Sequence, residues 1–118
     1  MQKQNTLLII DDEVDICLLL ERIMKRYYQS IGSSHTLAQA IDKATSLQPT
    51  HILLDNNLPD GYGLEFIAQF KDLCPEARII VISALDIGNE ALRAGADAFV
   101  NKPLRMNLVK KALLIEVE

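Results

Sequence analysis

The chain has 118 residues, of which 49% are hydrophobic and 24% charged, a balance typical of one globular domain with a single core. Its 16 acidic and 12 basic residues give a net charge of -4, which argues against nucleic acid as a direct ligand. No apolar run approaches the roughly 20 residues that span a bilayer, and the polar N-terminus is too short for a signal peptide. Cys17 and Cys74 fit no metal-ligand spacing, so we expect reduced thiols in a cytoplasmic protein.

The first half of the chain alternates short apolar runs with helical periods. Residues 7–10 (LLII) predict a strand buried on both faces, and 33–37 (SSHTL) predict a weaker second strand. Apolar side chains between and after these runs recur with the period of a helix. The first helix face comprises Ile16, Leu19, Leu20, Ile23, Met24 and Tyr27, and the second comprises Leu37, Ala40, Ile41, Ala44 and Leu47. Pro49 prevents the second helix from continuing.

The second half continues the alternation. Three further strands are predicted at 51–54 (HILL), 78–82 (RIIVI) and 98–100 (AFV). The proline and glycines of LPDGYG predict a loop at 58–63. A short helix is predicted at 87–93. Two longer helices are marked by Leu64, Ile67, Phe70 and Leu73, and by Leu108, Val109, Ala112, Leu113 and Ile115.

Five strands alternating with five helices predict an α/β fold, in which a parallel sheet is covered by helices on both sides. Ligands of such sheets bind at the carboxyl ends of the strands. The first strand is followed by Asp11 and Asp12, the third by Asp55, the fourth by Ser83 and the fifth by Lys102. We therefore expect three carboxylates, one hydroxyl and one ammonium to meet at one edge of the sheet.

Three neighbouring carboxylates repel one another, and a single lysine leaves an excess of negative charge. A hard divalent cation relieves this repulsion, and Mg²⁺ is the best match because it needs few protein carboxylates. The lysine then remains available for a second anion. A phosphoryl group on one carboxylate would satisfy the metal, the hydroxyl and the lysine together. The pattern therefore indicates transient phosphorylation of an aspartate.

Four segments resemble the receiver domain of two-component response regulators, over nearly the whole chain. They are DDE after the first strand, LLDNNLPDGYG around Asp55, VISA ending the fourth strand, and GADAFVNKP around the fifth. The resemblance implies a doubly wound five-stranded parallel sheet of strand order 2-1-3-4-5, in a flavodoxin-like three-layer sandwich. It also implies a single receiver domain over residues 1–118, either complete or the N-terminal part of a longer regulator.

The resemblance assigns the phosphoacceptor role to Asp55. Asp12 and Asp11 match the acidic pair that holds Mg²⁺, with Asp12 as the direct ligand and Asp11 often acting through water. Asn57 matches the position that offers its backbone carbonyl to the metal. Ser83 matches the switch hydroxyl that moves to the phosphoryl group.

The remaining site positions follow in the same way. Lys102 matches the lysine that pairs with the phosphoryl group, and Pro103 the proline that is commonly preceded by a cis bond. Phe99 occupies the aromatic switch position, although its reading as a plain core aromatic stays open. The loop that supports the acceptor is matched by Leu58, Pro59 and Gly63.

The function implied is that of a phosphoacceptor that takes a phosphoryl group from the phosphohistidine of a sensor kinase or a phosphotransfer protein. It would control an output domain or protein, with no membrane partner and no enzyme activity beyond its own phosphorylation and dephosphorylation. The alternative is a receiver-like interaction module that signals without efficient phosphorylation. A GTPase is disfavoured because Leu104 replaces the aspartate of the NKxD motif and no phosphate-binding GxxxxGK[ST] loop exists.

One segment departs from the family pattern. Gly95 follows Ser83 by only 12 positions, which is short by about three residues, nearly one helical turn. The segment also contains Gly88 and few apolar residues. We expect residues 85–93 to form at most two helical turns and to be the most mobile segment between strands.

Overall fold

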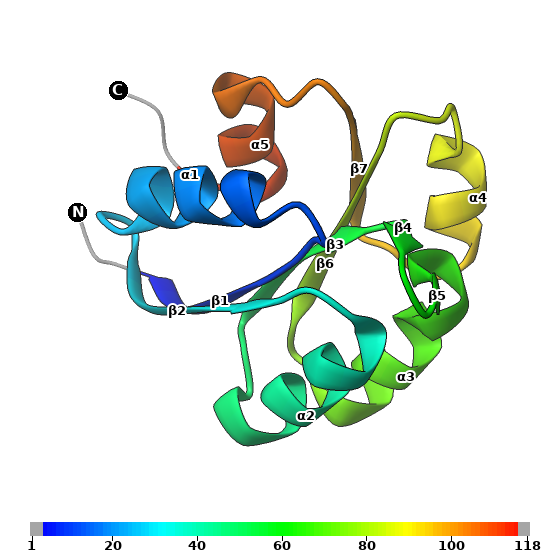
Figure 1. Cartoon of the computed structure of the whole chain (residues 1–118), viewed down its shortest axis with the longest axis horizontal. Helices are drawn as coiled ribbons and strands as arrows, with labels where there is room; N and C mark the ends of the chain where they lie inside the picture. Colours follow the sequence, from blue (N-terminus) through cyan, green and yellow to red (C-terminus); the bar gives the residue numbers. More distant parts are fainter. Residues whose placement is uncertain (1–3, 116–118) are drawn as a thin grey trace.

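The computed structural model describes residues 4–115 and shows one parallel sheet between two layers of helices (Figure 1). The five strands of the sheet are β1 (Gln4–Ile10), β2 (Tyr28–Ser34), β3 (His51–Asp55), β6 (Arg78–Ser83) and β7 (Ala98–Asn101). Their spatial order is β2-β1-β3-β6-β7, so the predicted doubly wound topology is confirmed. Among the described residues, no helix combines the length and the apolar character needed to cross a membrane.

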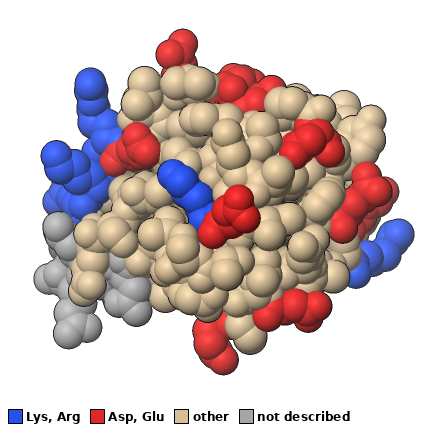
Figure 2. Space-filling model, turned by 60° about the horizontal axis from the view of Figure 1, so that its bottom comes forward, with Lys and Arg blue, Asp and Glu red and all other residues tan. Residues whose placement is uncertain are grey.

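The helices cover the two faces of the sheet unequally. One face is covered by α1 (Val14–Met24) and α5 (Met106–Ala112), and the other by α2 (Leu37–Leu47), α3 (Ile67–Leu73) and α4 (Gly88–Arg93) (Figure 1). A 3-10 helix, η1 (Gly63–Phe66), leads into α3. Because β1, β3 and β6 are buried on both faces, their side chains contribute alternately to two separate aliphatic cores. On the face shown in Figure 2, acidic side chains are scattered around the edge, basic side chains gather mainly at the left edge, and one basic and one acidic group lie together near the middle.

The second strand begins earlier than predicted. It starts at Tyr28, whose ring is buried, five residues before the predicted start at Ser33. The prediction placed this strand too late because β2 lies at the edge of the sheet and most of its residues are partly exposed, so its sequence (YQSIGSS) carries no apolar run. β2 ends at Ser34, so it overlaps the expected strand, 33–37, by only two residues.

Two further expectations need correction. Leu19 lies on the predicted face of the first helix but is 52% exposed, whereas the buried stripe of α1 runs through Cys17, Leu20 and Met24. A buried cysteine behaves as a small apolar side chain, so Cys17 can lie in the core although the predicted helix face did not include it. The loop at 58–63 contains a two-stranded antiparallel pair, β4 (Asn57–Leu58) and β5 (Gly61–Tyr62).

The register of the sheet brings the strand ends to one edge. The partners nearest that edge are Ile10 with Leu54, Asp55 with Ile82, and Ser83 with Asn101. The polar residues at the ends of β1, β3, β6 and β7 therefore lie at one level. This is the arrangement that the sequence predicted for the site.

Candidate functional site

The edge of the sheet gathers three carboxylates. Asp11 is fully buried, Asp55 is 4% exposed and Asp12 is exposed, and one carboxylate oxygen of each lies within 4.8 Å of the others. Asp11 follows β1 directly and Asp55 ends β3, so two adjacent strands fix the buried pair. Clustered carboxylate oxygens are the ligands that Mg²⁺ and Ca²⁺ prefer.

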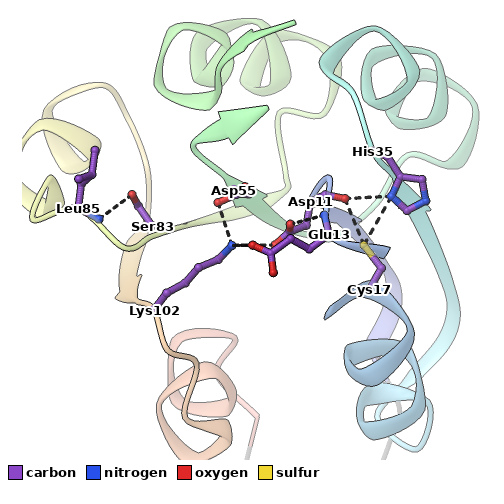
Figure 3. A network of polar contacts seen from close by, with 8 residues as sticks. All are labelled: Asp11, Glu13, Cys17, His35, Asp55, Ser83, Leu85 and Lys102. Carbon is purple, nitrogen blue, oxygen red and sulfur yellow. Dashed lines mark hydrogen bonds and ion pairs between the residues drawn. The ribbon is translucent and has the colours of Figure 1, made fainter. Parts of the chain in front are cut away.

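One ammonium group faces this cluster. Lys102 Nζ lies 3.2 Å from Asp11 Oδ2, 3.3 Å from Asp55 Oδ1 and 3.5 Å from Glu13 Oε1 (Figure 3). Asp11 Oδ2 is buried and accepts no well-directed hydrogen bond from the described residues, although the ammonium is near it. One lysine therefore leaves the carboxylates incompletely compensated, and the donor set fits an additional hard cation.

The electrostatics of the site are those of buried, mutually repelling acids. Burial and the neighbouring Asp11 raise the pKa of Asp55 to about 6, despite the opposing effect of Lys102. Burial also raises the pKa of Asp11, an effect opposed by the backbone N–H of Glu13 and by Lys102. Burial alone would lower the pKa of Lys102, but the surrounding carboxylates, Asp55 first, raise it. Asp55 is therefore a carboxylate at neutral pH that is costly to keep ionised without a cation.

We expect Asp55→Asn to raise the stability of the metal-free protein by about 3 kcal/mol at pH 7.5, because the pKa of Asp55 is raised from 3.8 to about 6 and each pKa unit is worth about 1.4 kcal/mol. A carboxyl whose folded-state pKa is raised stabilises the fold fully below its usual value of 3.8, and this contribution is lost as the pH rises through about 6. The advantage of the variant should therefore appear between pH 4 and 7. Urea unfolding in the presence of a chelator measures it, and an advantage that is equal at pH 4 and pH 7.5 would contradict this explanation.

The remaining predicted site residues lie nearby, but not all of them face the carboxylates. The Ser83 hydroxyl is buried and accepts a hydrogen bond from the backbone N–H of Leu85 at 3.1 Å, so it is engaged with its own loop (Figure 3). Phe99 is half-buried beneath α4, where a Cβ added to Gly88 would lie 3.1 Å from its ring. The expected cis peptide bond is present between Lys102 and Pro103.

Two residues near the acceptor were missed by sequence reasoning. Asn56 is buried, and its backbone carbonyl and side-chain Oδ1 accept hydrogen bonds from Gly63 N (2.8 Å) and Leu64 N (3.0 Å). Asp60 accepts hydrogen bonds from the first backbone N–H groups of α2, at 2.8 and 3.0 Å. Together they fix the loop that contains Asn57 and β4. An asparagine or aspartate beside a glycine-rich loop suggests only a turn, so the sequence does not reveal these long-range contacts.

Gly63 illustrates how tightly this loop approaches the acceptor. A Cβ at Gly63 would lie 2.6 Å from the backbone oxygen of Asp55 and 3.0 Å from Leu54. We expect Gly63→Ala to destabilise the protein by about 1–3 kcal/mol, because the backbone of β3 cannot give way cheaply. Chemical denaturation of the purified variant measures this loss.

Gly32→Ala provides the matched control for that substitution. Its added Cβ would also meet a close atom, at 2.7 Å, but that atom is the end of the partly exposed Leu47 side chain, which can rotate away. Alanine also suits the interior of a strand better than glycine. We expect a change of less than about 1 kcal/mol for Gly32→Ala. Equal losses of stability in Gly63→Ala and Gly32→Ala would show that the close approach of Gly63 to the backbone of Asp55 does not cause the loss.

The fold and the acidic edge define a class of signalling domain, and the comparison with protein families identifies it. Residues 7–114 match the family of response regulator receiver domains. The chain therefore belongs to this family, as its motifs predicted. Receiver domains are response regulators and not enzymes in the usual sense, and an acidic pocket that binds a divalent cation is one of their features.

The curated relatives include stand-alone and multidomain proteins. The chain is 32% identical to chemotaxis protein CheY of Thermotoga maritima, over 90% of this chain and 92% of the relative. It is 31% identical to sporulation initiation phosphotransferase F of Bacillus subtilis, over 91% and 89% of the two chains. It is 32% identical to the photosynthetic apparatus regulatory protein RegA of Rhodobacter capsulatus, but spans only 63% of that protein.

Solved structures agree with this assignment. A response regulator from Burkholderia pseudomallei, with a phosphorylated aspartic acid, calcium ion and citrate, superposes with a TM-score of 0.85 at 29% identity, over 93% of this chain and 66% of that one. The beryllofluoride-activated NtrC4 receiver domain superposes with a TM-score of 0.77 at 32% identity, over 92% and 90% of the two chains.

Proposed function

We propose that the chain is a phosphoacceptor receiver whose acceptor is Asp55. The observation that supports this most strongly is the placement of Asp55 at the end of β3, nearly buried, beside Asp11, Asp12 and Lys102. A buried carboxylate that is held against an ammonium and two other acids is oriented for attack on a phosphoryl group. Catalysis of this transfer rests mostly on positioning and on charge stabilisation.

The proposed reaction begins when a carboxylate oxygen of Asp55 attacks the phosphorus of a phosphohistidine. A P–O bond forms, the P–N bond breaks, and the electron pair returns to the leaving imidazole, which takes up a proton. Lys102 stabilises the negative charge of the transferring group. Attack of water on phosphorus later breaks the P–O bond and returns Asp55 as a carboxylate together with inorganic phosphate.

Asp12, Asp11, Asp55 and the backbone carbonyl of Asn57 are the proposed Mg²⁺ ligands, with Asp11 acting through water. When bound, Mg²⁺ would supply positive charge that neutralises the transferring phosphoryl group. The Ser83 hydroxyl would give up the hydrogen bond that it accepts from Leu85 N and donate a hydrogen bond to a phosphoryl oxygen. Phe99 would respond to the resulting movement of the loop. The switch is then a shift in population between two conformations.

The proposal extends to the partners and to the organisation of the chain. The donor would be a sensor histidine kinase or a phosphotransfer protein, and the recipient of the signal an output domain or protein. Residues 1–118 would act as one receiver domain in the cytoplasm, either alone or as the N-terminal part of a longer regulator. RegA, of which this chain covers 63%, is an example of a longer regulator that contains a similar segment.

Incubation with acetyl phosphate and Mg²⁺ tests the proposal without knowledge of the cognate kinase. Intact-mass spectrometry should show one added phosphoryl group that survives in acid and is lost in base, as an acyl phosphate is. Omission of Mg²⁺ should prevent its formation. A protein that remains unlabelled under conditions that label a known receiver would favour the alternative, an interaction module that signals without efficient phosphorylation.

The short α4 segment yields a separate prediction about the response. Only six residues form α4, and Leu85 and Leu92 are more than half exposed. We expect residues 85–93 to exchange amide hydrogens faster than α1, and beryllofluoride with Mg²⁺ to slow their exchange. Protection equal to that of α1 in the free protein, or exchange unaffected by beryllofluoride, would contradict this view of the switch.

A further inference from the structure

Two side chains lie behind the acidic pair, on the side away from Lys102. His35 Nδ1 is 2.9 Å from the backbone oxygen of Asp11, and Cys17 Sγ is 3.4 Å from the same oxygen (Figure 3). The sulfur and the ring nitrogen are 3.8 Å apart. The sequence pattern gives no role to His35 and predicts only a reduced thiol at Cys17. The structure instead makes both of them neighbours of the same carbonyl.

The chemistry of this contact determines which nitrogen carries the proton. A carbonyl oxygen can only accept, so the neutral ring must bear its hydrogen on Nδ1 for the 2.9 Å contact to be a hydrogen bond. The carbonyl belongs to the peptide that joins Asp11 to Asp12. Fixing that oxygen therefore fixes the plane of the peptide from which both side chains of the acidic pair extend.

His35 is itself held in place by two elements. It follows β2 directly, and the last residue of that strand, Ser34, accepts a hydrogen bond from Asp11 N at 3.0 Å. Its own backbone N–H donates to Gln39 Oε1 of α2 at 3.1 Å. The ring thus extends from a backbone that is anchored on both sides, and its position relative to the Asp11 carbonyl is set by the fold.

The two carboxylate oxygens of Asp11 contact only groups at the site itself, among the described residues. Its Oδ1 accepts a hydrogen bond from Glu13 N at 2.9 Å, and its Oδ2 lies near Lys102. Within residues 4–115, the carbonyl oxygen is the one atom of Asp11 that is contacted by side-chain donors from outside the site. Without the contacts from His35 and Cys17, the carboxylate of Asp11 would still be held by Glu13 N and Lys102. The orientation of the peptide between Asp11 and Asp12 would be less restricted.

We propose that His35 is a positioning residue for the divalent-cation site, acting through an Nδ1–H hydrogen bond to the Asp11 carbonyl. The inference rests on the proposed function, because it assumes that the acidic pair binds Mg²⁺. Groups that orient metal ligands typically contribute about 10–100-fold to metal affinity. Cys17 contributes a weaker second bond to the same oxygen, since a thiol is a poor donor.

Three variants of the full chain separate the donor from the bulk of the ring. An asparagine amide can place its N–H where Nδ1 lies, a glutamine amide places it where Nε2 lies, and phenylalanine keeps a ring without a donor. We expect His35→Phe and His35→Gln to weaken Mg²⁺ binding about tenfold, and His35→Asn to stay within about threefold of wild type. Isothermal titration calorimetry with MgCl₂ measures the affinities.

The outcomes distinguish this inference from the proposed function. If wild type neither binds Mg²⁺ nor is labelled by acetyl phosphate, the proposed function fails, and the inference with it. If wild type does both, and His35→Phe binds Mg²⁺ as tightly as wild type or His35→Asn binds as weakly as His35→Phe, the inference alone fails. The tautomer provides a test that needs no variant: two-dimensional ¹⁵N NMR of the imidazole should show His35 protonated on Nδ1, and protonation on Nε2 alone would overturn the inference.

Discussion

Replacing Asp55 by asparagine will abolish phosphorylation by acetyl phosphate. The substitution keeps the shape of the side chain but replaces the nucleophilic carboxylate with a neutral amide, and among residues 4–115 no other carboxylate at this edge has the same placement. Asp11 is held by Glu13 N and Lys102, and Asp12 is exposed to solvent. We expect the rate of labelling to fall by more than about a thousandfold, to the background level. Intact-mass spectrometry over time measures the loss.

Asp42→Asn is the matched control for charge, because Asp42 is an exposed residue of α2, which does not contribute to the acidic cluster. That variant should be labelled at the wild-type rate. Equal labelling of Asp55→Asn and wild type would rule out Asp55 as the main acceptor. The same Asp55→Asn variant should be more stable than wild type without metal, so loss of labelling cannot be attributed to unfolding.

Replacing Lys102 by alanine will produce the largest loss of stability at the site. Its ammonium is the only cation within 4.0 Å of Asp11 and Asp55 among residues 4–115, and both carboxylates are nearly or fully buried. Removing one partner of a buried ion pair leaves an uncompensated charge, at a typical cost of about 3–5 kcal/mol. Because Asp55 can take up a proton near neutral pH, we expect a smaller loss of about 2–4 kcal/mol in metal-free buffer at pH 7.5.

The pH dependence of this loss has a defined sign. The folded-state pKa of Lys102 is raised, so its stabilising effect is fully present below the usual 10.5 and fades only as the pH rises through the folded-state value. The loss measured for Lys102→Ala should therefore be complete at pH 7.5. It should shrink toward pH 5, where Asp55 becomes protonated. Urea unfolding at both pH values measures it, and a loss that grows on acidification would contradict the assignment.

Lys71→Ala is an informative comparison for Lys102→Ala. The ion pair of Lys71 with Asp97 is shorter, at 2.7 Å, but both side chains are about one-third exposed. Exposed pairs contribute about 1 kcal/mol or less because water screens them. If burial decides the effect, Lys71→Ala will cost less than Lys102→Ala despite its shorter distance. The reverse order would mean that the carboxylates at the sheet edge are compensated by something other than Lys102.

The predicted elements with apolar runs or sharp boundaries were the ones confirmed. The strand predicted at 51–54 is observed as β3 with one further residue, Asp55, and the strand at 78–82 as β6 with Ser83 added. These central strands are buried on both faces, so their sequences are continuous apolar runs. The polar residue after each run could then be placed at the sheet edge from topology alone. That is why the convergence of Asp11, Asp55 and Lys102 was predictable.

The parts that escaped prediction depend on contacts between distant residues. The edge strand β2 is stabilised by pairing with β1, which lets a polar sequence adopt a strand. Asn56 accepts a hydrogen bond from Leu64 at the far end of the acceptor loop, and Asp60 accepts one from Leu37, 23 residues earlier in the chain. His35 became significant only when the register of β1 and β2 placed it behind Asp11. None of these contacts leaves a periodic or compositional mark in the sequence.

Borohydride reduction of the phosphorylated protein is the most direct test of the central claim that Asp55 is the phosphoacceptor. Borohydride converts an aspartyl phosphate to homoserine, which marks the modified residue permanently. After treatment with acetyl phosphate and Mg²⁺, tandem mass spectrometry of the digested protein should find homoserine at position 55. Homoserine at position 11 or 12 instead, or none in a protein that carries the added phosphoryl mass, would contradict the claim.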